Sequence, residues 1–588
     1  MRVDSTTFQA GAASAPNPSA SLLRDATATI NMGLWLLVKL PLALILVTLV
    51  SALWKIRPFI LGQFTSPFLR IRGPRSSSWL FGQVKEKHES GDDYAYDRWF
   101  EEYGPVVMIR GFFNMPRLLT SDTRAINHVL THSAEYQKPP QARRTLSRLL
   151  GEGVLITEGD THRQQRRIMN PAFGPSQIRE LTEIFVEKAI ELRDVWMKEI
   201  SDKSDLSSAS ASDSARINVM RGLSKMTLDV IGLAGFNYEF HALNPVGAPN
   251  ELAQAFEEIF VVPDKVPVLR IMRGFFPILD LIKTEESRRI DRALAVMRRI
   301  GSQLIAEKKA EILQSASEKE KGGDGVGRRS LQGRDLLTLL IRANMATDIP
   351  ENQRLSDEDV LAQVPTFLVA GHETTSTATT WCLYALTQAP AVQEKLRAEL
   401  LTVDTDSPTM DELNALPYLD MVVRETLRVH APVPETIRVA TKEDVVPLER
   451  PFTDRDGQVH LSVKVSAGSS IVIPIKTLNR SKELWGEDAH EFRPERWEDP
   501  PEAISSIPGV WSHMLTFLGG PRACIGYRFS LVEMKALIFT LVRAFEFALA
   551  VPPSDIKLMP GIVERPRLRS EPEQGNQMPL IVRKYDRA

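Results

Sequence analysis

One cysteine-containing loop offers the clearest chemistry in the sequence. Residues 517–526 read Phe-Leu-Gly-Gly-Pro-Arg-Ala-Cys-Ile-Gly, and an apolar helical pattern follows at once, from Tyr527 to roughly Ala548. A thiolate at Cys524 would face the positive end of that helix, where free backbone N–H groups can point at its sulfur. Both effects favour the ionised form of the thiol, which is the form that ligates a metal.

The other fixed positions of this loop suit a flat, charged cofactor. Phe517 can lie against a large planar ring system, and Arg522 can pair with an anionic edge of it. Gly520 and Gly526 let the backbone approach closely. The pattern Phe-x-x-Gly-x-Arg-x-Cys-x-Gly resembles the haem-binding signature of the cytochrome P450 family, in which a cysteine thiolate, here Cys524, holds the haem iron. The alternative is an ordinary buried cysteine, but the matched positions before a long helix favour haem ligation.

A second motif lies at the centre of a long predicted helix. Residues 356–359 form a capping-box-like start, and the helical pattern continues to about Gln388. Within it, residues 370–375 read Ala-Gly-His-Glu-Thr-Thr, which resembles the oxygen-activation motif of the same family. The small residues would leave room for dioxygen, while Glu373 and Thr374 supply a carboxyl and a hydroxyl that can pass protons.

Two further segments resemble groups that surround the haem propionates in this family. Residues 159–173 resemble a helix on which a Trp and an Arg share one face; here His162 stands at the Trp position and Arg166 at the Arg position. Arg438 matches a further propionate contact. The alternative for the basic helix is an ordinary solvated face. Two residues depart from the family pattern, His162 and Pro365. Pro365 is expected to kink the central helix.

One more pair of motifs points to structure rather than to chemistry. Residues 424–428 read Arg-Glu-Thr-Leu-Arg, which places Glu425 and Arg428 one helical turn apart, and Arg496 follows within residues 492–497. An isolated surface pair of this kind stabilises a helix by only about 0.2–0.5 kcal/mol. The combination resembles the family's Glu-x-x-Arg motif with a later arginine. The resemblance implies a buried triad that holds the cysteine loop region in shape.

The N-terminal part of the chain predicts a membrane anchor. Residues 1–32 have the composition of a disordered segment, and residues 33–54 form an apolar run that is long enough to cross a bilayer as one helix. Basic residues follow the run, which predicts that the rest of the chain faces the cytosol from the endoplasmic reticulum membrane. A cleaved signal peptide is the alternative, but the run is too long and starts too far in. We divide the remainder into a linker, 55–82, and a catalytic domain, 83–588.

Composition excludes several other classes of protein. The chain has 588 residues, 43% of them hydrophobic, which supports a large core. A formal charge of −2 gives no reason to expect a nucleic-acid partner. With only two cysteines, Cys382 and Cys524, the sequence has no disulfide framework and fits a reducing compartment.

The resemblance implies a mainly α fold with a small β component, the cytochrome P450 fold, and a haem-thiolate monooxygenase that carries haem b. Electrons are expected from a separate NADPH-dependent reductase, with cytochrome b5 as a further partner, because the chain has no fused flavin domain. The amino-acid sequences of the motifs resemble those of fungal members that oxidise lipophilic secondary metabolites, terpenoids especially. Alternatives are a haem-thiolate isomerase or dehydratase, a non-catalytic haem sensor, and a sterol or fatty-acid hydroxylase of general metabolism.

Overall fold

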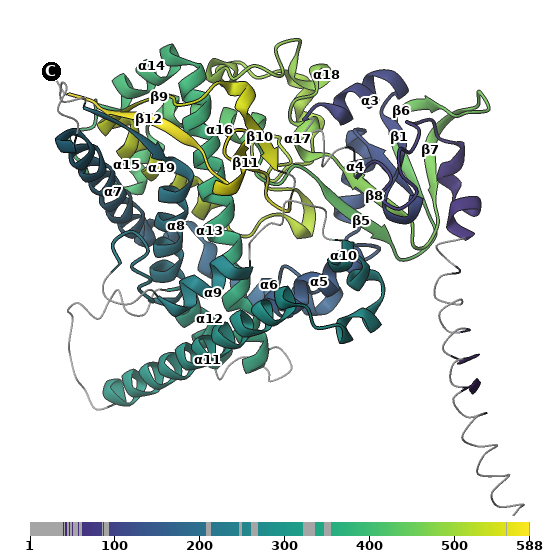
Figure 1. The fold of residues 1–588 in the computed structure, drawn as a ribbon, viewed down its shortest axis with the longest axis horizontal. Helices are drawn as coiled ribbons and strands as arrows, with labels where there is room; N and C mark the ends of the chain where they lie inside the picture. Colours follow the sequence, from purple (N-terminus) through teal and green to yellow (C-terminus); the bar gives the residue numbers. More distant parts are fainter. Residues whose placement is uncertain are drawn as a thin grey trace, which may run out of the picture. The chain divides into compact units, whose positions relative to one another are not determined.

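The computed structural model of the chain describes residues 61–84, 93–206, 213–245, 250–259, 268–320, 335–345, 354–559 and 561–586, together with a few isolated positions between 39 and 86. The chain divides into two units, Met1–Thr65 and Ser66–Ala588, and Figure 1 shows the helices and strands of the larger one. Residues 66–82 of the predicted linker therefore belong to the same unit as the predicted catalytic domain. The backbone N–H of Met108, for example, donates to the carbonyl of Arg72 over 2.8 Å.

The predicted anchor, residues 33–54, lies almost entirely outside the described residues. Among the positions that the structure does describe, no helix has the length and apolar character needed to cross a bilayer.

Helices make up most of the larger unit. They are α3 (Ala95–Tyr103), α4 (Thr123–Thr131), α5 (Pro140–Leu150), α6 (Gly159–Met169), α7 (Pro175–Leu206), α8 (Val219–Phe236), α9 (Glu251–Ile259), α10 (Val268–Phe275), α11 (Glu285–Glu320), α12 (Leu336–Met345), α13 (Asp357–Gln388), α14 (Pro390–Leu400), α15 (Met410–Asn414), α16 (Pro417–Val429), α17 (Ile475–Leu478), α18 (Lys482–Trp485) and α19 (Tyr527–Ala544). As predicted, Ser356 and Asp359 form a capping box at the start of α13, and the helix continues through Pro365.

Strands form a smaller part of the unit. They are β1 (Val106–Arg110), β2 (Pro116–Thr120), β3 (Tyr136–Gln137), β4 (Ser214–Asn218), β5 (Thr436–Ala440), β6 (Asp444–Thr453), β7 (Val459–Val465), β8 (Ser470–Ile473), β9 (Phe545–Leu549), β10 (Ile556–Met559), β11 (Arg565–Leu568) and β12 (Pro579–Lys584). The largest sheet has the order β1-β2-β8-β5-β3, in which only β2 and β8 run parallel. It lies on the opposite side of the unit from α7, α8 and α19 (Figure 1). The mainly α prediction with a small β component is confirmed.

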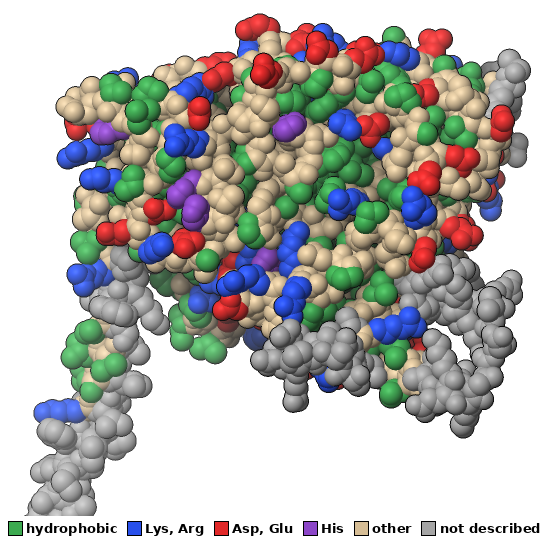
Figure 2. Space-filling view, turned by 180° about the vertical axis from the view of Figure 1, so that it is seen from behind, with side chains coloured by type: hydrophobic (Ala, Val, Ile, Leu, Met, Phe, Trp, Pro, Cys, Tyr) green, Lys and Arg blue, Asp and Glu red, His purple; other side chains and the backbone are tan. Residues whose placement is uncertain are grey.

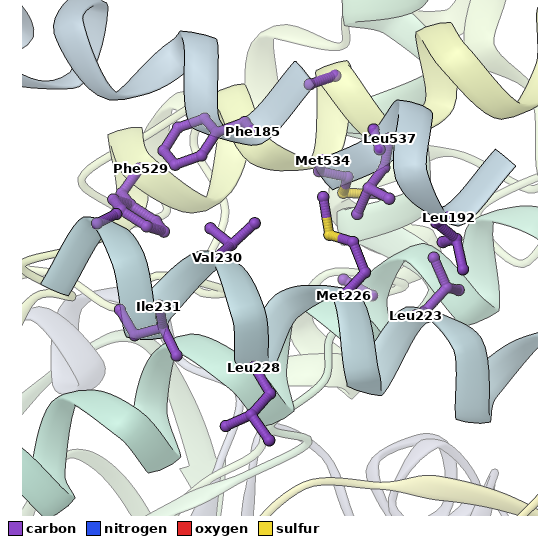
Figure 3. Packing of buried hydrophobic residues seen from close by; sticks show 14 of the residues in the cluster. Phe185, Leu192, Leu223, Met226, Leu228, Val230, Ile231, Phe529, Met534 and Leu537 are labelled. Atoms are coloured by element: carbon purple, nitrogen blue, oxygen red, sulfur yellow. The ribbon is translucent and has the colours of Figure 1, made fainter. Parts of the chain in front are cut away.

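The main core lies where four helices meet. Helix α8 packs along α13, and α7 packs along α19. Figure 3 shows Phe185 of α7 against Phe529 of α19, with Met226 and Val230 of α8 facing the same interior. The helix that carries residues 370–375 and the helix that follows Cys524 are therefore held in one apolar body, which fixes the distance between the two predicted motifs.

The predicted end of the last helix was wrong by four residues. Helix α19 ends at Ala544, and residues 545–549 form β9, which pairs with β12. In β9, Phe545 and Phe547 are buried and Glu546 between them is exposed. An apolar run of this length suits either conformation, and pairing with a strand from the end of the chain decides the outcome.

An ionisable side chain lies inside the contact between α19 and α13. Glu533 is only 1% exposed, and among the described residues its two carboxyl oxygens make no hydrogen bond of normal geometry. Burial raises the pKa of Glu533 well above its usual value, and the hydroxyl of Thr375 offsets this rise only in part. The folded protein therefore holds the proton of Glu533 to a higher pH than the unfolded chain does.

The Glu533→Gln variant should gain stability relative to the wild type as the pH rises. Above the unfolded-state pKa of about 4.5, the unfolded chain loses a proton that the folded chain keeps. Wild-type stability therefore falls with pH by up to about 1.4 kcal/mol per unit, whereas the amide of the variant has no proton to lose. Thermal unfolding midpoints between pH 5 and 8 measure this difference, with the exposed Glu573→Gln as control. A difference that stays constant with pH would contradict the assignment.

Candidate active site

Cys524 lies in a closed loop immediately before α19. Its backbone N–H donates to the carbonyl of Phe517 over 2.8 Å, which joins the two ends of the motif. The Cys524 side chain is exposed, yet burial among the surrounding residues raises its thiol pKa, while the N–H of Gly526 and the charge of Arg166 lower it. The thiol is therefore accessible, although enough protein surrounds it to shift its pKa.

Glycine has a steric role at two positions of this loop. Gly520 has a φ of +67°, and a Cβ there would lie 2.6 Å from the carbonyl oxygen of Leu130. A Cβ at Gly519 would lie 1.7 Å from the carbonyl oxygen of Pro508. At Gly526, by contrast, a Cβ would meet only the ring of Phe173 at 3.7 Å, so protein packing does not require glycine there. The geometry of the loop thus explains why glycine is needed at position 520. At Gly526 it leaves space next to the backbone that a ligand could occupy.

The ring of Phe517 is fixed by two aromatic neighbours. Its centroid lies 5.6 Å from that of Trp511 and 5.9 Å from that of Tyr527. Trp511 comes from the segment before the loop and Tyr527 from the first turn of α19. This contact orients the start of the motif relative to the helix behind the thiol.

Basic side chains converge beside the cysteine loop. The pKa of Lys138 lies well below its usual value because of burial and the nearby charges of Arg522, Arg438 and Arg143. Burial lowers the pKa of Arg438 to about 10, and burial with the charge of Arg143 lowers that of Arg522 to about 10. We call Lys138, Arg143, Arg438 and Arg522 the cation cluster.

Glu158, the residue that caps α6, is the acid that pairs with this cluster. Its carboxylate forms an ion pair with Arg522, accepts from the backbone N–H of Lys138 over 3.0 Å, and lies 3.8 Å from the ammonium of Lys138. One carboxylate does not balance four cations. The buried Nη1 of Arg522 also has no hydrogen-bond partner among the described residues.

The two predicted residues of α6 have different surroundings. His162 is buried, and burial together with the charges of Lys138 and Arg166 lowers its pKa to about 4, so the imidazole is neutral at pH 7. Arg166 donates from Nη1 to the carbonyl oxygen of Ala523 over 2.5 Å. The sequence predicted Arg166 as a propionate contact, and in the structure this side chain supports the backbone next to Cys524.

The residues present fit a planar, doubly anionic cofactor with a metal at its centre. A buried lysine whose pKa is lowered by burial and by neighbouring guanidinium charges, and an unpartnered guanidinium N–H, call for additional negative charge. Two carboxylates on the edge of a haem would supply that charge at the cation cluster. The exposed thiol of Cys524 would then be accessible to the iron.

The centre of α13 supplies the second group of predicted residues. Ala370 is exposed, although the helix lies in the core, and its carbonyl oxygen accepts from the Thr374 hydroxyl over 2.7 Å. Glu373 forms an ion pair with Arg565 of β11. A Cβ on Gly371 would lie 2.9 Å from Ile231 of α8, so this glycine serves helix packing. Ala370 alone of the two small residues faces open space.

The three residues of the predicted triad lie together in the core. Arg428 donates from Nη2 to Oε1 of Glu425 over 2.8 Å, and both side chains have no exposed surface. Arg496 lies 3.4 Å from the same oxygen and donates to Asp488 over 2.6 Å. The remaining N–H groups of Arg428 reach backbone carbonyls, among them that of Asn479 at 3.0 Å.

Asn479 connects this triad to the cysteine loop. Its side-chain oxygen accepts from the backbone N–H of Leu515 over 3.0 Å, and its side-chain nitrogen donates to Thr516 Oγ1 over 2.8 Å. The Thr516 hydroxyl donates in turn to the carbonyl oxygen of Leu427 in α16 over 2.7 Å. The residues just before Phe517 are therefore tied to the helix that carries Glu425 and Arg428.

Several residues of the site were not identified from the sequence. They are Lys138, Arg143, Glu158 and Arg565. The basic run around α5 was the available signal for Lys138 and Arg143, but a basic run on a helix usually forms a solvated face. No local signal marked Glu158 or Arg565, because their partners are distant in the sequence.

The cytochrome P450 family profile matches residues 72–569, which contain every site residue described above. The chain belongs to the cytochrome P450 family. It is 58% identical over 539 residues to Cytochrome P450 monooxygenase 205 of Postia placenta, covering 91% of this chain and 96% of that protein. It is 34% identical over 529 residues to Cytochrome P450 monooxygenase claO of Ampulloclitocybe clavipes, covering 88% and 93%.

The predictions of the family and of an oxidoreductase are thereby confirmed. Membership of the cytochrome P450 family implies a haem cofactor, a redox partner and a small-molecule substrate. Figure 2 shows that acidic and basic side chains are interspersed over one face of the protein.

Removing Arg428 should destabilise this P450 strongly. The Arg428→Met variant leaves the Glu425 carboxylate buried with only part of its hydrogen bonds, at a cost of about 3–5 kcal/mol. The Glu425→Gln/Arg428→Met double variant should recover part of this loss, because no unpaired charge remains. Arg424→Met, which removes a half-exposed pair with Asp420, serves as control and should cost about 1 kcal/mol or less. Chemical unfolding measures all three, and equal losses for Arg424 and Arg428 would contradict the assignment.

Proposed function

We propose that this P450 is a haem-thiolate monooxygenase that inserts one atom of dioxygen into a lipophilic small molecule. The observation that carries the proposal is the exposure of the Cys524 side chain in a loop that also contributes Arg522 to the cation cluster. A thiol that serves only as core packing would be closed on all sides, as Cys382 is in α13.

The cofactor in this proposal is haem b. Cys524 would supply the thiolate ligand of the iron. The propionates would pair with Arg522, Arg438 and the neighbouring basic residues, with His162 as a neutral hydrogen-bond donor. When bound, the haem supplies the electron-transfer and oxygen-activation chemistry, favoured by thiolate ligation. The cation cluster would hold the anionic edge of the haem.

Glu373 and Thr374 are the proposed proton-delivery residues. Monooxygenation combines dioxygen with two electrons and two protons, so that one oxygen atom enters the substrate and the other leaves as water. Thr374 already donates its hydroxyl hydrogen to the Ala370 carbonyl, which leaves its oxygen lone pairs free to hold a water in line. Glu373 would pass protons to that water.

Electrons and membrane attachment are further parts of the proposal. We expect NADPH to supply electrons through a separate reductase, with cytochrome b5 as a second donor. Residues 33–54 would anchor the protein as a single span in the endoplasmic reticulum membrane, after the segment 1–32 and before the linker 55–82, with the catalytic domain 83–588 in the cytosol.

The proposed substrate class is a fungal secondary metabolite, with terpenoids first. This proposal is supported by the amino-acid sequences of the motifs and by the similarity to monooxygenases from Postia placenta and Ampulloclitocybe clavipes. A sterol or fatty acid is the second substrate class. A haem-thiolate isomerase or dehydratase, or a haem sensor, would show no oxygen- and NADPH-dependent turnover, and the pair Glu373 and Thr374 favours the monooxygenase.

The Cys524→Ser variant should remain folded and lose the thiolate-type absorption of the reduced carbon-monoxide complex. Serine removes the soft sulfur ligand while changing the volume very little. Difference spectra of the reduced protein, with and without carbon monoxide, measure the effect. Cys382→Ala is the matched control and should keep the wild-type spectrum, because Cys382 is closed within α13. A wild-type spectrum from Cys524→Ser would show that Cys524 is not the ligand.

The Thr374→Ala variant should consume NADPH but form less oxidised product per NADPH, with hydrogen peroxide rising in compensation. The hydroxyl that holds the delivering water is lost, so dioxygen leaves as peroxide before its bond is broken. Product, peroxide and NADPH measured in the same reaction give the coupling. Thr379→Ala is the control on the same helix, since Thr379 bonds the carbonyl of Thr375 over 2.9 Å in the core. Unchanged coupling in Thr374→Ala would favour a purely structural hydroxyl.

A further inference from the structure

A salt bridge to the C-terminal hairpin holds the acid at the centre of α13. The Oε2 atom of Glu373 accepts from the guanidinium of Arg565, the first residue of β11. The two side chains are only 13% and 11% exposed. On the other side of the carboxylate, Nδ1 of His372 lies 3.8 Å from Oε1. The carboxylate is therefore held toward the hairpin by a charged partner that is itself largely buried.

The residue before Arg565 is fixed at each of its polar groups. The backbone N–H of Glu564 donates to the carbonyl of Pro432 over 2.9 Å, and its carbonyl accepts from the indole N–H of Trp381 over 3.2 Å. Its carboxylate accepts from the ammonium of Lys476 over 2.5 Å. Successive residues of an extended chain point to opposite sides, so this attachment of Glu564 leaves Arg565 directed at α13.

Register within the hairpin adds a second constraint. Arg565 lies opposite Met559 of β10, and Arg567 lies opposite Lys557. Arg565 and Arg567 share one face of β11, and Arg567 donates to the carbonyl of Pro572. The strand therefore presents two similar side chains, only one of which reaches the proposed proton-delivery group.

We propose that Arg565 is the positioning residue for Glu373, and that the Glu564–Lys476 ion pair anchors Arg565 in that role. The inference rests on the proposed function, because a position for Glu373 matters only if this carboxylate moves protons. A guanidinium presents several N–H donors in one plane and so fixes both the place and the orientation of a carboxylate. Without it, the Glu373 side chain can rotate toward His372 or away from the helix, and the path of protons to Thr374 is broken.

The first test compares coupling in variants of β11. Arg565→Gln should lower the product formed per NADPH on the order of tenfold, since misplacing a catalytic group by about 1 Å costs up to about 100-fold. Arg565→Lys should recover part of the coupling, because it keeps the charge but loses the planar fork. Arg567→Gln is the matched control and should couple as the wild type does. If Arg565→Gln does not accumulate as folded protein, Arg565→Lys tests the inference in its place. Intermediate coupling in Arg565→Lys supports the inference, and wild-type coupling overturns it.

The second test does not depend on turnover. Thermal unfolding of the substrate-free full chain is compared among Arg565→Gln, Glu373→Gln and the double variant. A direct pair predicts that the double variant loses less than the sum of the single losses, and additive losses would overturn the inference. Lowered stability with wild-type coupling in Arg565→Gln would show a merely structural pair, which also overturns it.

The same variants separate this inference from the proposed function. If Glu373→Gln loses coupling while Arg565→Gln keeps it, the positioning role is wrong and the proton-delivery role stands. If neither Glu373→Gln nor Thr374→Ala loses coupling, the proton-delivery role itself is wrong.

Discussion

The charge pair Glu425 and Arg428, from which water is excluded, is the interaction on which the cysteine loop depends. Two ions without exposed surface are tolerated only when every remaining donor and acceptor has a partner. The donors of Arg428 satisfy this condition through backbone carbonyls of the segment that follows β8, including that of Asn479. Asn479 then bonds Leu515 and Thr516. The geometry of the loop before Cys524 is thus a consequence of satisfying one buried ion pair in α16.

The second organising feature is an excess of positive charge beside the same loop. Lys138 and Arg143 come from the first third of the chain, Arg438 from β5 and Arg522 from the loop itself. Glu158 balances only part of this charge. In an environment of low dielectric constant, repulsion within such a cluster destabilises the folded protein. We therefore expect the cluster to favour folding only when an anion is bound to it. The unbalanced positive charge, which an anionic cofactor would neutralise, therefore lies beside the thiol that would ligate the metal of that cofactor.

Glu373, the proposed proton-delivery acid of α13, is held by a different element, the hairpin β10–β11 near the end of the chain. Glu373 is held from this hairpin through Arg565, while the hydroxyl of Thr374 bonds within its own helix. The side chains of these two neighbouring residues are thus positioned by different parts of the structure. The hydroxyl depends only on α13, whereas the carboxylate depends on the packing of the hairpin against α13 and on the buried pair between Glu564 and Lys476.

The sequence by itself determined the family, the mainly helical fold, the ends of α13 and the positions of the loop and helix motifs. These follow from local rules: a capping box, helical periodicity, and fixed spacings within short segments. Only the tertiary structure decided that residues 545–549 leave the helix, because pairing with β12 outweighs an ambiguous apolar pattern. It likewise revealed Lys138, Glu158 and Arg565, and it placed Arg166 on the carbonyl of Ala523. An ion pair between residues far apart in the chain leaves no periodic trace in the sequence, since its energy depends on burial and distance that exist only after the core has packed.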